Sequence, residues 1–164
     1  MAVEMIKQNA SDIPYLHRDF HNLFNLGLCY LHDHFGEKAV IEYLTRFAGN
    51  YYSPLSKTIS KNGLSVLRDY LKRIYTAEEA LDELEFIESD PHSLTVRIRS
   101  CPAIRHMKKS NVAIYQNYVL TSSLVYRIIA ENAGYQYQLL EYDSDTGHAV
   151  HLFFKSDKKE EQMS

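Results

Sequence analysis

The chain has no tryptophan, only two cysteines and no apolar run of the length that crosses a membrane. Cys29 and Cys101 allow at most one disulfide bond, which excludes a small disulfide-stapled secreted scaffold. Residues 1–10 lack the pattern of a signal peptide, and a membrane helix needs about 18 consecutive apolar residues. We therefore expect a reduced, cytoplasmic protein with no membrane partner.

An excess of charge of one sign is also missing, because the formal net charge is −3. Nucleic-acid-binding domains usually carry a basic excess, so no nucleic-acid partner is expected. The chain contains no phosphate loop, no GxGxxG or GxSxG motif and no paired CxxC motifs. No cofactor and no metal are therefore predicted.

Tyrosine, by contrast, is abundant, with 13 residues in a chain of 164. The apolar fraction of 45% and the charged fraction of 24% are ordinary for one globular domain with a sizeable core. We predict an N-terminal arm over residues 1–11, a single domain over 12–155 and a charged flexible tail over 156–164. A tyrosine-rich interior suits a pocket that is partly apolar and partly polar.

Apolar spacing predicts a first helix that begins near Pro14 and ends near Gly36. Its expected buried stripe is Leu16, Phe20, Leu23, Phe24, Gly27, Leu31 and Phe35. A second set of side chains lies away from this stripe and is expected to face solvent: His17, His21, Asn25 and His32. The spacing of His17 and His21 suits a metal, but the glutamate of the zinc-protease pattern is missing. Two further helices are expected around residues 40–51 and 64–75.

Two β-hairpins are predicted from alternating apolar residues. The first turns at residues 89–93, and its expected register places Glu85 opposite Arg97 and Glu83 opposite Arg99. The second pairs residues 135–142 with 148–155, and strict alternation puts Tyr137 on the face opposite to His151. A helix at about residues 114–133 separates them. The expected fold is α+β, with N-terminal helices packed on a four-stranded antiparallel sheet.

Cys101 is the first candidate for chemistry. It lies where a strand ends and a helix begins with Pro102, near unpaired N–H groups and the positive end of the helix dipole. The surrounding cationic side chains are Arg97, Arg99, Arg105, His106, Lys108 and Lys109. This setting predicts a lowered thiol pKa, with Cys101 as nucleophile and His106 as base or cation. Two alternatives stay open: a buried cysteine that packs as a small hydrophobe, and a basic segment that holds a ligand's carboxylate.

Aromatic residues form the second candidate site. His151 lies among aromatic residues of the last strand and either orients a ligand or is a structural histidine with internal partners. Tyr118 and Tyr126 belong to the predicted fourth helix, as do the hydroxyl-bearing threonine and serines at residues 121–123. Tyr142 is expected on the same face of the second hairpin as His151. These tyrosines either line a pocket or belong to the core.

Two motifs resemble known families. Residues 96–104, Val-Arg-Ile-Arg-Ser-Cys-Pro-Ala-Ile, and residues 147–153 resemble the L-2-amino-thiazoline-4-carboxylate hydrolase-like family. The end of the chain is also similar to 4-vinyl reductase-type domains, which end in Cys-x3-Gly-x3-Cys-x-Phe. The corresponding positions here are Asp143, Gly147, His151 and Phe153, so both cysteines are replaced. This puts a cysteine-ligated zinc in doubt, although Asp143 and His151 are themselves possible ligands.

The resemblance covers about residues 80–155 and implies a fold like that of transport-protein-particle subunits, which are often dimeric. A homodimer built on the first helices is therefore expected. If the domain is an enzyme, the resemblance implies hydrolytic opening of a small heterocyclic or amide-like acid. Cys101 is then the nucleophile or key polar group, His106 the proton carrier, Asp143 or His151 the orienting partner, and Arg99 or Arg105 the carboxylate anchor. The alternative is a non-catalytic domain that binds or senses a small, apolar molecule.

Overall fold

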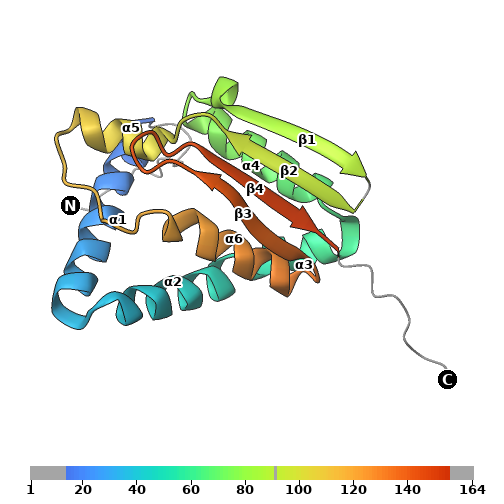
Figure 1. Cartoon of the computed structure of the whole chain (residues 1–164), viewed down its shortest axis with the longest axis horizontal. Coiled ribbons are helices and arrows are strands. Elements are labelled where there is room, and N and C mark those ends of the chain that lie inside the picture. Colours follow the sequence, from blue (N-terminus) through green and yellow to red (C-terminus); the bar gives the residue numbers. More distant parts are fainter. Residues whose placement is uncertain (1–13, 91, 156–164) are drawn as a thin grey trace, which may run out of the picture.

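The computed structural model describes residues 14–90 and 92–155, so the predicted arm at 1–11 and tail at 156–164 lie outside it (Figure 1). The described chain is an α+β fold of six α-helices and four strands, as predicted. The elements are α1 (Pro14–Phe35), α2 (Glu37–Tyr51), α3 (Ser53–Asn62), α4 (Ser65–Ala77), the 3₁₀ turn η2 (Leu81–Glu83), β1 (Leu84–Asp90), β2 (Ser93–Ile98), α5 (Pro102–Lys109), α6 (Leu120–Asn132), β3 (Gln136–Tyr142) and β4 (Ala149–Phe154).

The strands form one antiparallel sheet in the order β1-β2-β4-β3. The register of the first hairpin is confirmed, because Glu85 pairs with Arg97 and their side chains lie 3.1 Å apart. Glu83 and Arg99 are also opposite, since the N–H of Arg99 donates to the carbonyl of Glu83 at 2.8 Å. Charge pairing and burial therefore agree on one register, as the sequence predicts.

The second hairpin contains a β-bulge that strict alternation does not predict. The register shifts between Leu139 and Glu141, which brings Tyr137 opposite Phe153 and Leu139 opposite His151. The extra residue inverts the alternation on one side of the bulge. Tyr137 therefore lies on the same face as His151, and the prediction that the two are on opposite faces is wrong.

The core consists of two clusters of buried apolar side chains. The larger one joins α3, α4 and α6 to the sheet face that carries Leu94, Val96 and Phe153. The smaller one joins α1, α2 and α5, with Leu28, Leu44 and Met107 at its centre. Figure 1 shows α1 and α5 at the end of the sheet where the β3–β4 turn lies. The space between the two clusters is where the candidate site forms.

Helix α1 is rotated relative to the sequence prediction. Asn25 is 0% exposed, and its side chain donates to the carbonyl of Ala113 and accepts from the N–H of Tyr115, each at 2.8 Å. His21 is half-buried and its Nε2 lies 3.0 Å from Oε1 of Glu78. His32 is also half-buried, and the side chain of His17 lies outside the described residues. The prediction of a solvated polar face is therefore wrong for His21 and Asn25, because buried backbone groups need polar partners.

The apolar stripe of α1 correspondingly faces outward in part. The large apolar residues of this helix that are more than half exposed are Phe20, Leu23, Leu26, Tyr30 and Phe35. The predicted burial of Phe20, Leu23 and Phe35 is therefore wrong. None of the described helices combines the length and the hydropathy needed to span a bilayer.

Helix α6 begins at Leu120, later than the predicted start near residue 114. Residues 112–119 form an irregular segment and turn. Asn25 binds the carbonyl of Ala113 and the N–H of Tyr115, which are groups that a longer helix would use in its own hydrogen-bond ladder. A side chain distant in sequence thus determines where this helix begins.

Candidate functional site

The structure contains a cavity of about 240 Å³ bounded by α1, α4, α6, β4 and the N-terminus of α5. Its wall is mostly apolar and includes Phe24, Phe47 and Val125. The lining residues with polar side-chain groups are His21, Tyr52, Tyr75, Glu78, Cys101, Tyr118, Thr121, Ser122, Tyr126, Tyr142 and His151. The cavity thus brings together five of the nine residues that the sequence proposes for a site: Cys101, Tyr118, Tyr126, Tyr142 and His151.

His151 is the most deeply placed of these groups, with 0% exposure in the middle of β4. Its Nδ1 lies 2.8 Å from the Tyr137 hydroxyl, and the Tyr126 ring packs edge-on against it at 5.0 Å between centroids. Nε2 is buried and has no hydrogen-bond partner among the described residues. Burial lowers the pKa of His151 to about 4, so the imidazole is neutral near pH 7.

Nδ1 of His151 is directed to Tyr137, which lies outside the cavity lining, and Nε2 has less than 1 Å² of accessible surface. Buried polar atoms in folded proteins nearly always have a partner. Nε2 of His151 is an exception, and its neighbours enclose it. Each interpretation of His151 from the sequence has support, because the residue lines the cavity and its Nδ1 has an internal partner in Tyr137.

Cys101 is the N-cap residue of α5 and its N–H donates to the carbonyl of Thr146 at 2.9 Å. Burial raises the pKa of the thiol, and the charge of Glu78 raises it further. Backbone N–H groups of α5 and the charge of Arg105 act in the opposite direction without overcoming burial. The prediction of a lowered thiol pKa is therefore wrong, because desolvation outweighs the helix terminus and the nearby cations.

Gly147 allows the β3–β4 turn to approach Cys101 closely. Its φ is +70°, and a Cβ at this position would lie 2.4 Å from Cys101 Cβ and 2.8 Å from Ile104 Cδ1. Real Cβ atoms do not approach one another this closely, so only glycine fits here without a shift of the backbone. Gly147 thus helps to form the cavity wall next to the thiol.

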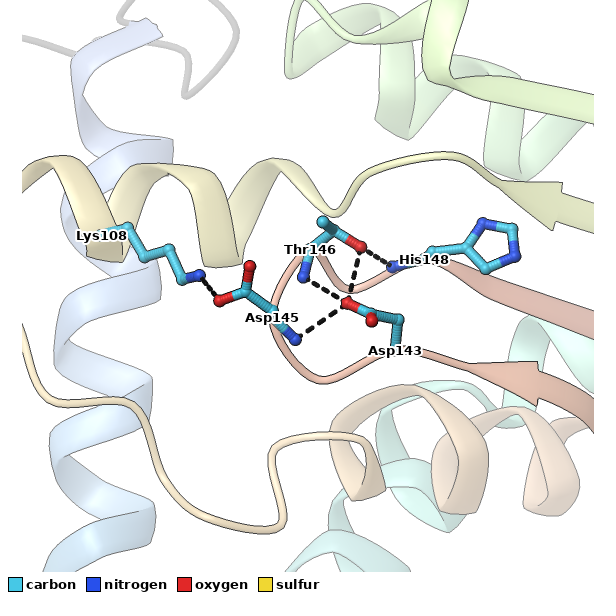
Figure 2. Close-up of polar contacts among 5 residues, drawn as sticks. All are labelled: Lys108, Asp143, Asp145, Thr146 and His148. Carbon is cyan, nitrogen blue, oxygen red and sulfur yellow. Dashed lines mark hydrogen bonds and ion pairs between the residues drawn. The ribbon is translucent and has the colours of Figure 1, made fainter.

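Asp143 organises this turn (Figure 2) and is not among the residues that line the cavity. Its Oδ1 accepts from the N–H groups of Thr146 and Asp145, at 2.7 and 3.0 Å, and from the Thr146 hydroxyl at 2.9 Å. These hydrogen bonds, above all that from the Thr146 backbone, lower the pKa of Asp143. Lys108 of α5 pairs with Asp145 and holds the turn against that helix. The geometry therefore gives Asp143 a structural task.

The basic side chains around α5 also lie outside the cavity. Arg105 Nη1 lies 2.9 Å from Glu83 Oε1, and Arg99 Nη2 lies 3.8 Å from Glu85 Oε2. His106 lines a second hollow with Arg105 and Lys109, which adjoins the cavity because Glu78 and Pro102 line both. The structure therefore does not bring Arg99, Arg105 or His106 into the cavity with Cys101.

Three residues near the cavity were not proposed from the sequence as site residues. His21 and Glu78 both line it, and their 3.0 Å contact joins two positions 57 residues apart. The third residue is Tyr137, whose hydroxyl lies 2.8 Å from Nδ1 of His151. His21 and Asn25 are polar residues on an otherwise apolar helix, and this pattern was a sign that they are buried. The position of Tyr137 beside His151 depends on the β-bulge, which the sequence does not reveal. Among residues 14–90 and 92–155, no three His, Cys, Asp or Glu side chains cluster closely enough to hold a metal ion.

No protein-family model matches this chain, and no curated protein is significantly similar to it. The resemblance to the thiazoline-carboxylate hydrolase-like family therefore stays a prediction. A fold of this kind does not fix a function, so the chemistry of the cavity carries the functional reasoning.

Proposed function

We propose that this domain binds a small molecule in the cavity and that binding, rather than catalysis by Cys101, is its primary activity. The observation that carries the proposal is the cavity itself, with a volume of about 240 Å³ and a mostly apolar wall that includes Phe24, Phe47 and Tyr126.

The size and the chemistry of the cavity support the same proposal. An apolar cavity of about 150 Å³ holds benzene, and the volume here is about 240 Å³. Burial raises the pKa of Tyr118 and of Tyr126, so both hydroxyl groups stay neutral at physiological pH. Apolar rings with a few neutral polar groups are the usual lining of a small-molecule site.

A thermal-shift screen of small uncharged and anionic compounds tests the proposal. A compound present at about 100 times its Kd should stabilise the protein by about 2.7 kcal/mol, which raises Tm by several degrees. The matched variant Val125→Phe places a ring in the cavity and should abolish the shift while the fold is retained. A screen in which no compound shifts the wild-type protein would contradict the proposal.

Hydrolysis at Cys101 is a second candidate, and one observation favours it. Cys101, His21 and Glu78 line the same cavity, and the 3.0 Å contact from His21 to Glu78 resembles a base with its orienting carboxylate. His21 then takes the proton-carrying task that the sequence suggested for His106. The substrate class implied by the family resemblance is a small heterocyclic or amide-like acid. Undiminished turnover of thiazoline and cyclic-amide acids by Cys101→Ala would remove this candidate.

We also propose that the protein is a homodimer that buries the outward apolar face of α1 and α2. The exposed large residues of α2 that extend this face are Ile41, Tyr43 and Tyr51. Light scattering should give twice the chain mass of 19.1 kDa. Leu23→Glu should produce a monomer, whereas Leu81→Glu, at an exposed apolar position on η2, should leave the dimer intact. A monomeric wild-type protein would overturn this part of the proposal.

A cytoplasmic location is part of the same proposal. Both cysteines are free thiols, and free thiols persist in reducing compartments. Cell fractionation with an antibody against the protein tests it, and recovery from an oxidising compartment would count against it.

A further inference from the structure

We infer that the second copy in the proposed homodimer closes the mouth of the cavity, so that small molecules enter and leave it while the two copies are apart. The inference rests on the proposed function and deepens it, because it names what covers the open side of the site. Dimerisation then controls access to the cavity.

The mouth of the cavity lies at Phe20. The cavity is not enclosed, and most of its described lining residues are buried or half-buried. Phe20 is the exposed one among them, with 55% of its surface accessible. Towards the adjoining hollow the wall consists of Glu78 and Pro102, which are both half-buried. Solvent therefore reaches the cavity beside Phe20.

Aromatic rings join this mouth to the outward apolar face of α1 and α2. The Phe20 ring stacks on Phe24 at 5.6 Å between centroids, and Phe24 lies 6.2 Å from Phe47. Phe47 in turn stacks on Tyr51 at 5.3 Å. Phe24 and Phe47 line the cavity, whereas Tyr51 is 68% exposed. The rim of the cavity and the outward face are thus one continuous aromatic surface.

The exposed part of this face is large enough for a stable dimer. Its large apolar residues have exposed fractions of 42–68%: Phe20, Leu23, Leu26, Tyr30, Tyr43 and Tyr51. At about 200 Å² for one large side chain, they expose roughly 700 Å² together. A standard interface buries about 800 Å² on each partner, and monomeric proteins rarely expose an apolar patch of this size. We therefore expect this face to be covered in solution.

The absence of charge on this part of α1 favours a second copy as the cover. Between Phe20 and Tyr30 the chain contains no Asp, Glu, Lys or Arg. A partner surface must then be apolar as well, because a charge placed against this stretch loses its water without gaining a partner. In a two-fold dimer the face meets its own copy, which satisfies this condition. Phe20 belongs both to the face and to the mouth, so a copy seated on α1 also covers the mouth.

Alkylation of Cys101 by iodoacetamide reports whether the mouth is open, because Cys101 lines the cavity and is partly exposed. In the wild-type protein, trypsin releases residues 100–105 as a peptide in which Cys101 is the one cysteine. Mass spectrometry of this peptide gives the rate at a series of protein concentrations, and analytical ultracentrifugation gives the Kd of the dimer. At about ten times that Kd roughly one chain in five is monomeric, so Cys101 should react about fivefold more slowly than in the dissociated protein.

Two variants separate the dimer contact from the cavity itself. Neither Leu23 nor Leu81 is among the lining residues, and both are exposed. Leu23→Glu should be monomeric and react at the fast rate at every concentration, whereas Leu81→Glu should reproduce the concentration dependence of the wild type. Leu23→Glu also supplies the dissociated state if dilution does not separate the wild-type dimer. Leu26→Glu takes its place if Leu23→Glu fails to fold.

The possible outcomes distinguish this inference from the proposed function. A dimer in which Cys101 reacts as fast as in the monomer would overturn the inference, because iodoacetamide would then enter past Glu78 and Pro102. The homodimer and the small-molecule site would both stand. A wild-type protein that is monomeric at all concentrations would overturn the homodimer and the inference together. If that monomer sediments with phosphatidylcholine vesicles, a membrane surface covers the apolar face instead, and the inference is equally overturned.

Discussion

The two sides of the N-terminus of α5 differ in how their polar groups are satisfied. On the outer side, Arg105 is partly exposed and pairs with Glu83, and His106 belongs to a surface hollow. On the inner side, Cys101 and His151 line a mostly apolar cavity, and Nε2 of His151 is unpartnered among the described residues. The outer side has more charged groups, whereas the inner side has the more apolar lining and the unpartnered nitrogen.

This difference shows why a dense run of charged residues is a poor marker of a site. Exposed ion pairs contribute about 0–1 kcal/mol each, since water and neighbouring carboxylates already satisfy the charges. A buried polar atom without a partner costs about 1–3 kcal/mol. An isolated polar residue within an apolar strand, such as His151, is the better marker of a position that lines the cavity.

Gly147→Ala should have the largest effect, because it disrupts the inner side directly. The new Cβ would overlap Cys101 Cβ at 2.4 Å, and the residue would hold a φ of +70°. We expect a loss of about 4 kcal/mol in the free energy of unfolding, from overpacking and the left-handed backbone together. Urea denaturation measures it.

Gly134→Ala is the matched control for that change. Its φ is +80°, but no atom lies within 4 Å of the position that its Cβ would take. Only the backbone term remains, so the expected loss is about 1 kcal/mol. Equal losses in the two variants would show that the turn does not press against Cys101.

The stability of the inner side should depend on pH through His151. Its pKa falls from 6.5 to about 4 on burial, so the unfolded chain binds a proton that the folded chain does not bind between these values. The contribution of neutral His151 to the free energy of unfolding is therefore fully present above pH 6.5 and is lost as the pH falls towards 4. This contribution amounts to about 3 kcal/mol.

His151→Phe lacks this titrating group, so the difference in unfolding free energy between wild type and variant should change by about 3 kcal/mol over that range. Urea denaturation at a series of pH values measures both proteins, and other titrating groups cancel in the difference. Parallel pH profiles would show that His151 titrates normally. Tyr137 and Tyr126, the groups that face it, remain neutral throughout this range because burial raises the pKa of both.

The reactivity of Cys101 should be that of a partly buried thiol with a raised pKa. In a Cys29→Ser variant, Cys101 is the single cysteine. We expect iodoacetamide to react with it at pH 7 at least about tenfold more slowly than in the urea-unfolded chain, because burial raises its pKa. Fast alkylation at pH 6 would show that the pKa of the Cys101 thiol is lowered after all, and it would favour hydrolysis as the function.

Changes on the outer side should have the smallest effects. Arg105→Gln removes an exposed pair with Glu83 and should cost less than about 1 kcal/mol in unfolding free energy. His106→Gln should leave the affinity for a compound found in the thermal-shift screen unchanged, since His106 lies outside the cavity. A large loss of binding in either variant would mean that the two sides of α5 form one site after all.

Much of the fold could be predicted because it depends on local patterns. Alternation and paired charges gave the register of Glu85 with Arg97, and Gly36 marks the end of α1 as expected. The rotation of α1 was not predictable from its apolar stripe, because distant backbone groups at residues 113–115 require Asn25. The bulge in β3 likewise inverts an alternation that looks regular in the sequence.

The candidate site was predictable in part for the same reason. Cys101 and His151 stand next to recognisable element boundaries and strand positions, so both could be named. His106 lies five residues after Cys101, which corresponds to about 140° around the axis of α5 and directs its side chain away from the cavity. His21 and Glu78 meet only through tertiary packing. Closeness to Cys101 in the sequence therefore favoured His106, which lies outside the cavity, and gave no sign of His21 and Glu78, which line it.

The most direct test is a long-range proton–nitrogen NMR spectrum of the His151 side chain at pH 5.5, recorded with and without a compound that binds in the thermal-shift screen. We expect a neutral imidazole at this pH, because burial holds the pKa at about 4. The His151 resonances should also shift when the compound is added, since His151 lines the cavity. An imidazolium at pH 5.5, or His151 resonances that do not respond to the bound compound, would contradict the proposed site.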